Sequence, residues 1–63
     1  MSQFWVNYCN WMWNDDVMNL GQLHMLAEKG KITREEYKGF CGQEYDDYNP
    51  DDSKKTKSEI VTD

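Results

Sequence analysis

Residues 30–37 read Gly-Lys-Ile-Thr-Arg-Glu-Glu-Tyr, and this stretch decides the predicted fold. Thr33 and Glu36 have the spacing of a capping box, in which each side chain accepts a hydrogen bond from the backbone amide of the other residue. Thr33 is the N-cap, Ile32 precedes it, and the closing tyrosine is the fourth residue after Thr33. This is the spacing of a hydrophobic staple. Gly30 can end a preceding helix in the left-handed conformation. The stretch therefore predicts a tight turn between two helices.

Two helices are expected on either side of this turn. The first runs over 20–29, because Asn19 is a good N-cap and Gln22 completes a second capping box with it. The second runs over 34–41. Together they form a helical hairpin whose local signals agree with one another at each step. The residues of this structural motif are Gly30, Ile32, Thr33, Glu36, Tyr37 and Gly42.

Residues 3–14 are expected to form a further helix, which makes the predicted fold an all-α, three-helix minidomain. Phe4, Tyr8 and Met12 recur at helical spacing, although the aromatic content of the segment also fits a β-strand. Ser2 is the expected N-cap of this helix. We expect Phe4, Tyr8 and Met12 to face the hairpin and at least one indole to face outward.

The same segment contains the candidate binding residues. A helix that is apolar on most of its circumference is normally buried on most of it, and a chain this short has little with which to cover it. Trp and Tyr are also enriched at the energetic centres of protein interfaces. We interpret the aromatic cluster as partly core and partly partner-binding surface, and its members are Phe4, Trp5, Tyr8, Trp11 and Trp13.

Length and composition exclude several classes of function. The chain has 63 residues, of which 38% are hydrophobic and 30% charged, and its net charge is −5. A catalytic pocket would use up the core of a chain this small, so we expect no enzyme activity, no cofactor and no small-molecule substrate. The chain has no basic stripe that could neutralise phosphates, so no nucleic acid is expected as a partner. No run approaches the roughly 18 apolar residues of a membrane span, and no signal peptide is evident.

The residues that could bind a metal lack the spacing for it. Cys9 and Cys41 are far apart and the chain has one histidine, His24, so no zinc site is expected. The Asp-Asp pairs lack the alternating oxygen ligands of a calcium loop. We interpret both cysteines as reduced and partly buried, with a single disulfide as the alternative. His24 is expected to be a partly exposed structural residue.

The last third of the chain differs in composition from the rest. Residues 44–63 carry seven acidic and three basic side chains. We expect Tyr45, and also Tyr48, to fold back onto the hairpin, and the rest to be a flexible acidic tail, because it has few apolar residues. This divides the chain into a helical minidomain over 1–48 and an acidic polar tail over 49–63.

Residues 28–37, Glu-Lys-Gly-Lys-Ile-Thr-Arg-Glu-Glu-Tyr, and residues 42–45, Gly-Gln-Glu-Tyr, carry a family resemblance. They resemble the XkdX family of small phage proteins, in which a short aromatic helix precedes a helix that ends in a Lys-Gly-x-Ile-Thr step. The resemblance covers about 4–46 and is close over 26–45. It implies a setting among the tail and tail-fibre genes of phages and prophages of Gram-positive bacteria, and it implies little about mechanism.

Two features depart from that family. The connection 15–19 lacks the Gly-Tyr-Tyr-Thr-like turn associated with it, and the chain beyond Tyr48 is longer than in most members. Residues 26–37 are also similar to helical hairpins of the SHOCT type, which use a Gly-x-Ile-Thr-x-Glu-Glu-aromatic step. The shared step is largely a way to turn a corner between helices.

These observations lead to one expected function and two alternatives. We expect a non-enzymatic phage structural or assembly protein that docks through its aromatic helix onto a tail, baseplate or tail-fibre protein. The alternatives are a small acidic phage-encoded inhibitor that binds a host enzyme, and a self-associating small helical protein. The expected location is the host cytoplasm at synthesis and then the virion tail.

Overall fold

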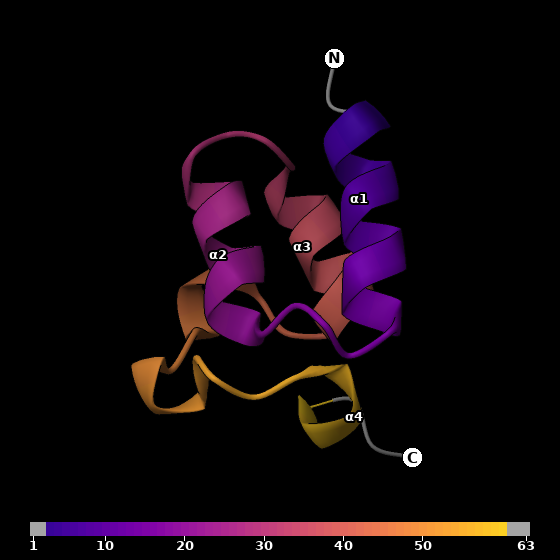
Figure 1. Cartoon of the computed structure of the whole chain (residues 1–63). Coiled ribbons are helices and arrows are strands. Elements are labelled where there is room, and N and C mark those ends of the chain that lie inside the picture. Colours follow the sequence, from indigo (N-terminus) through magenta and orange to yellow (C-terminus); the bar gives the residue numbers. More distant parts are fainter. Residues whose placement is uncertain (1–2, 61–63) are drawn as a thin grey trace.

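The structure of the chain is a computed structural model that describes residues 3–60. It confirms the all-α fold, and no strand occurs over these residues. The three longer helices pack side by side, with the remaining helical segments beside and beneath them (Figure 1). The elements are α1 (Gln3–Asn14), α2 (Leu20–Glu28), α3 (Arg34–Cys41), η1 (Tyr45–Asp47), η2 (Pro50–Asp52) and α4 (Lys57–Ile60). The expected N-cap Ser2 lies outside the described residues.

The α2–α3 hairpin forms through side-chain caps at the start of each helix. In α2, Asn19 Oδ1 accepts from the Gln22 amide at 2.9 Å, and Gln22 Oε1 accepts from the Asn19 amide at 3.1 Å. In α3, Thr33 Oγ1 accepts from the Glu36 amide at 3.0 Å, and Glu36 Oε1 accepts from the Thr33 amide at 2.8 Å. Gly30, with φ of 79°, adopts the left-handed conformation after α2. These contacts join residues close in sequence, so the hairpin is specified locally.

The remaining residues of the turn motif lie in the core or end the hairpin. Ile32 and Tyr37, which have the staple spacing, are both buried. Gly42 is left-handed, with φ of 77°, and its amide donates to the Lys38 carbonyl oxygen at 2.7 Å. Gly42 therefore ends α3 as a left-handed C-cap.

The core corrects the predicted orientation of α1. Phe4 is exposed and does not face the hairpin, and Tyr8 is exposed at the border between the hairpin side and the outside of α1. Met12 is partly buried and packs against the core, as predicted. Cys9 and Trp13 face inward instead, which corresponds to a rotation of the helix by about one residue, or roughly 100°. Both are 0% exposed. The buried cluster comprises Cys9, Trp13, Met18, Leu20, Leu23, Ile32, Tyr37 and Cys41.

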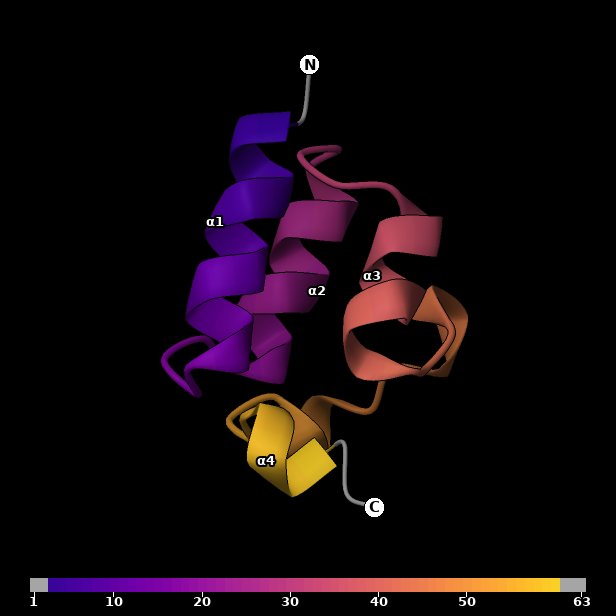
Figure 2. The same cartoon turned by 90° about the vertical axis from the view of Figure 1, so that its right-hand side faces the viewer.

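The C-terminal segment corrects the expectation of a flexible tail. Residues 49–60 lie across the lower ends of the helices (Figures 1 and 2). The amide of Leu20 donates to the Lys55 carbonyl oxygen, and that of Gly21 to the Ser53 carbonyl oxygen, both at 2.8 Å. Gly21 permits this approach, because a Cβ there would lie 3.0 Å from that oxygen. The segment thus supplies acceptors to first-turn amides that have no partner within α2.

Further polar contacts fix the last part of this segment. The Thr56 amide donates to Glu59 Oε1 at 3.0 Å, which begins α4. The Ser58 amide donates to Asp16 Oδ1 at 2.9 Å. Ile60 is half-buried and packs against the core. Hydrogen bonds therefore hold a segment whose apolar content is too small to predict its folding.

Candidate protein-interaction surface

Trp13 belongs to the core and not to a binding surface. Its side chain is fully buried, and its Nε1 donates to the Phe40 carbonyl oxygen at 2.9 Å. That oxygen lies in the last turn of α3, where carbonyl groups lack partners within the helix. Trp13 therefore fixes α1 on α3, which corrects the prediction that it contacts a partner.

Three other aromatic residues of α1 are exposed. Phe4 is 67% exposed, Trp11 64% and Tyr8 36%. With Asn7 they line a shallow hollow of about 340 Å³. We call Phe4, Asn7, Tyr8 and Trp11 the outer face of α1. Large exposed aromatic side chains grouped in this way are typical of protein interfaces.

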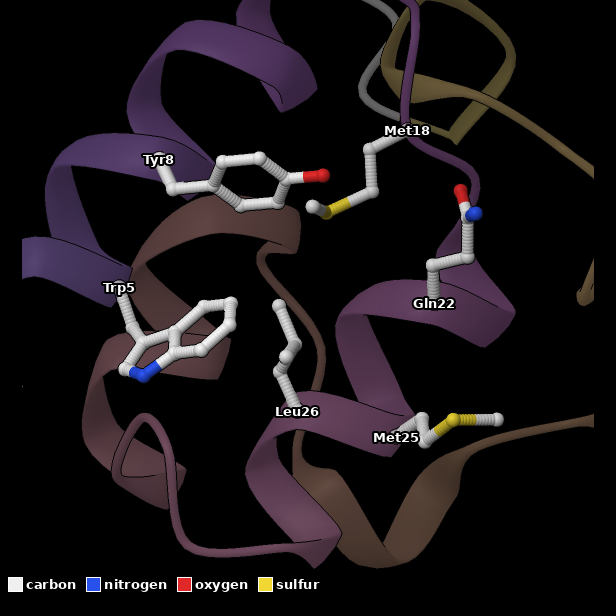
Figure 3. Close-up of a pocket in the computed structure, with 6 residues that line it drawn as sticks. All are labelled: Trp5, Tyr8, Met18, Gln22, Met25 and Leu26. Carbon is white, nitrogen blue, oxygen red and sulfur yellow. The ribbon is translucent and has the colours of Figure 1, made fainter.

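A second hollow lies between α1 and α2 and shares Tyr8 with the outer face. It measures about 200 Å³. Figure 3 shows Tyr8 pointing from α1 toward Met18, and Trp5 and Leu26 entering the hollow from opposite helices. Met25 is exposed at its edge. We call this hollow the α1–α2 groove, and its residues are Trp5, Tyr8, Met18, Gln22, Met25 and Leu26.

Trp5 connects the groove to the outer face. Its ring centroid lies 5.0 Å from that of Phe4 and 5.7 Å from that of Tyr8, and both pairs meet edge to face. Lys31 Nζ lies 5.5 Å from the Trp5 ring, within the range of a cation–π contact. The helix itself carries no acidic or basic residue over 3–14. The two hollows therefore form one aromatic surface without charge, with an ammonium group at its N-terminal end.

His24 has a structural role. Its imidazole is stacked on Tyr45 at a centroid distance of 4.2 Å and on Tyr48 at 3.9 Å, with interplanar angles of 9° and 17°. Two rings this close and this parallel must lie on opposite faces of the imidazole. The stack attaches η1 and the residue after it to α2, and it confirms that both tyrosines fold back onto the hairpin.

The two thiols are buried and free. Burial, with the Glu36 carboxylate as a smaller cause, raises the pKa of the Cys9 thiol to about 11. Burial also raises the pKa of Cys41 and of Tyr37 above their ordinary values. The Tyr37 hydroxyl is buried without a hydrogen-bond partner of normal geometry among residues 3–60, although Cys41 is close enough to influence it. These groups are protonated and covered at neutral pH, so they are poor nucleophiles.

A hollow with a charged lining lies beside α3. It has a volume of about 430 Å³ and is lined by Arg34, Glu35, Lys38 and Glu44. Lys38 Nζ lies 2.6 Å from Glu44 Oε2, which raises the pKa of Lys38, and Arg34 lies over the Tyr45 ring at 4.6 Å. Two positive and two negative side chains leave no net charge for recognising an ion.

Residues 3–60 contain neither a metal-binding cluster nor a helix that could span a membrane. Over 3–60, no group of three or more His, Cys, Asp or Glu side chains is arranged to hold a metal ion. No helix in that range has the length and apolar character needed to cross a membrane. Comparison of the chain with protein-family models, with curated proteins and with solved structures gives no match.

Proposed function

We propose that this protein is a non-enzymatic phage structural or assembly protein that docks onto a tail, baseplate or tail-fibre protein. The observation that carries the docking is the α1–α2 groove, where Trp5, Tyr8 and Met25 present apolar surface beside one another. Aromatic residues and Met are enriched at interfaces, and the unbranched Met side chain adapts to the shape of a partner. The phage setting is supported by the resemblance of 26–45 to the XkdX family.

The groove is suited to receive an apolar side chain of the tail protein. Its α2 wall begins at the Asn19–Gln22 capping box, so the wall is held before a partner arrives. Gln22 Oε1 is used in that box, which leaves its NH₂ group as a donor for a partner at the groove edge. A pre-formed groove of this kind lowers the entropy cost of association.

The test is the composition of particles from a phage that encodes this chain. We expect mass spectrometry to find the protein in purified virions or in tail-assembly intermediates. Met25→Glu places a charge in the groove and should deplete the protein from those particles at least tenfold. Val17→Glu, at an exposed apolar residue outside the groove, is the matched control and should leave the amount unchanged. Absence of the unmodified protein from both virions and intermediates would contradict the proposal.

A second candidate function is a small acidic inhibitor of a host enzyme. The observation that favours it is the placement of Asp46, Asp47 and Asp51 in the short helical turns η1 and η2, where their backbone positions are fixed. Against it, Asp46 pairs with Arg34 at 3.8 Å, which reduces the field that could mimic nucleic acid. Retention from host lysate of one enzyme that DNA displaces, with no tail protein bound, would support this candidate over the first.

A further inference from the structure

The outer face of α1 has the shape of a helix-packing site. Phe4, Asn7, Tyr8 and Trp11 occupy positions i, i+3, i+4 and i+7 of one helix, and a hollow of about 340 Å³ lies among them. Four residues at this spacing form the hole into which a side chain of a facing helix inserts in knobs-into-holes packing. The face points away from the core residue Cys9, and α1 lies at the edge of the molecule (Figure 2).

This face is also complementary to itself. A twofold axis perpendicular to α1 at its midpoint would place Phe4 of one copy opposite Trp11 of a second copy, and Asn7 opposite Tyr8. This arrangement sets one large aromatic side chain, Phe4, against another, Trp11, and the amide of Asn7 against the phenol ring of Tyr8. We infer that the outer face packs against the same face of a second copy of the chain, with the two α1 helices antiparallel. The pairing goes beyond the proposed function and leaves Trp5 and the rest of the groove open to the tail protein.

The charges at the two ends of α1 favour this orientation. Asp15 and Asp16 directly follow the C-terminal end of the helix, where Lys57 Nζ donates to Asn14 Oδ1 at 2.8 Å, so two negative charges and one positive charge leave a net of −1 there. Lys31 lies beside Trp5 near the N-terminal end. In an antiparallel pair, each acidic end lies next to the Lys31 end of the other copy. A parallel pair would place Asp15 beside the same residue of the second copy, and like charges repel.

The exposed area sets the expected strength. An aromatic side chain buries about 150–250 Å² when it is fully covered. The exposed fractions of Phe4, Tyr8 and Trp11 then correspond to about 250–400 Å² on each copy. An interface of this size lies below the range of stable complexes, so the pair forms reversibly. We expect half-dimerisation between about 10 µM and 1 mM.

Sedimentation equilibrium of the full chain tests the pairing. The apparent mass should rise from that of the 7.5 kDa monomer at micromolar concentration toward twice that value near millimolar concentration. Trp11→Ala should weaken dimerisation at least tenfold, whereas Val17→Ala, equally exposed but outside the face, should change it less than twofold. A monomer at all concentrations, or equal effects of the two variants, would overturn the inference. Particle incorporation tests the groove separately, because Trp11 does not line it.

The orientation is tested by cross-linking two single-cysteine additions. Gln3→Cys and Asn14→Cys lie at opposite ends of α1 on exposed positions, and the natural Cys9 and Cys41 are buried. In an equimolar mixture treated with a short bis-maleimide, antiparallel pairing should favour the mixed dimer over both same-variant dimers by at least fivefold. Predominance of the same-variant dimers would overturn the antiparallel arrangement.

Discussion

The α2–α3 hairpin and helix α1 are held in place in different ways. In the hairpin, Thr33 and Glu36 are three residues apart, and the side chain of each accepts a hydrogen bond from the backbone amide of the other. The hairpin is therefore stabilised by several small contacts between residues close in sequence. Helix α1 is held by large side chains that meet distant parts of the chain, above all Trp13 on Phe40 of α3. The comparison teaches that equal substitutions should have unequal effects, large on the core side of α1 and small in the hairpin turn.

The largest difference is expected between replacing Trp13, which is buried, and replacing Trp11, which is exposed. Trp13→Ala removes a fully buried indole and its hydrogen bond, and we expect a loss of about 3–5 kcal/mol. A domain of this size has a stability of roughly 3–9 kcal/mol in total, so this variant should lose a large part of its stability. Trp11→Ala should change the stability of dilute protein by less than about 0.5 kcal/mol.

Urea unfolding followed by circular dichroism measures both effects. Trp13→Phe is the useful companion variant, because it keeps an aromatic ring but removes the donor to the Phe40 carbonyl oxygen. It should be intermediate in stability, with a loss of about 1–3 kcal/mol. Equal unfolding midpoints for Trp13→Ala and Trp11→Ala would show that the inward face of α1 is wrongly assigned.

The second-largest effect is expected from high pH, which should lower the stability of the fold through the buried thiol of α1. Burial raises the pKa of the Cys9 thiol from 9.0 to about 11. The folded state therefore holds this proton more tightly than the unfolded chain, so the stabilisation is fully present below pH 9 and is lost as pH rises to about 11. The raised pKa values of Tyr37 and Cys41 act in the same direction. Unfolding midpoints measured across this range should fall.

Cys9→Ala separates the thiol from other causes of alkaline unfolding. The variant lacks the ionising group, so its stability should fall less steeply between pH 9 and 11 than that of the parent chain. The slope is the informative quantity, because the variant also loses some packing at all pH values. Identical slopes in the two proteins would exclude Cys9 as the source.

The α2–α3 hairpin and helix α1 were not equally predictable from the sequence. Asn19, Gln22, Thr33 and Glu36 act through neighbours in sequence, and their spacing alone predicts the hairpin and its bounds. The rotation of α1 could not be predicted, because apolar residues occupy most of its circumference. Which side is buried depends on the Phe40 carbonyl group, which is distant in sequence and requires the Trp13 donor.

The same reasoning explains how much of the surface the sequence predicts. Phe4, Trp5, Tyr8 and Trp11 do reach a shared surface, and their residue types alone pointed to an interface. The α2 side of the groove, including Met25, was missed, since it depends on the angle between two helices. The partners of His24 were missed for a similar reason: stacking with Tyr45 and Tyr48 joins separate elements and leaves no local pattern.

Replacing two glycines of the hairpin by alanine should change the stability by smaller amounts, and with opposite signs. Gly30→Ala forces a side chain into a left-handed conformation, where φ is 79°, and should cost about 1–2 kcal/mol. Gly39→Ala lies within α3, where an added Cβ has nothing within 4 Å, and should stabilise by about 0.5–1 kcal/mol. Thermal unfolding of both variants measures the signs, and a loss in Gly39→Ala would mean that its site is more crowded than the structure shows.

The C-terminal segment is a third case, in which a local signal was present but overlooked. Thr56 and Glu59 have the same spacing as the two caps of the hairpin, and the Thr56 amide does bond Glu59. The acidic and polar composition around Pro50 indicates a flexible tail instead. Composition predicts poorly here, because 49–60 is held mainly by hydrogen bonds, such as those from the Leu20 and Gly21 amides, while Ile60 is the apolar residue that packs against the core.

Asp16 gives a small effect and the most direct test of how that segment is held. It is the non-glycine residue with positive φ, 61°, among those described, and its carboxylate accepts from the Ser58 amide at 2.9 Å. Asp16→Ala should cost about 1 kcal/mol through the lost acceptor and a less tolerant backbone. Asp16→Asn keeps a carbonyl oxygen and a residue type that accepts this conformation, so it should cost less than about 0.5 kcal/mol.

Hydrogen exchange shows whether the loss is local. If 49–60 is anchored as the structure indicates, Asp16→Ala should speed exchange at the Ser58 amide most, and at the Leu20 and Gly21 amides to a smaller extent, because their acceptors belong to the same segment. The Glu36 amide, capped within the hairpin, should exchange as in the parent chain once the global loss is subtracted. Uniform acceleration at all four amides would mean that the segment and the hairpin unfold as one unit, and that the two regions differ in their contacts but not in their cooperativity.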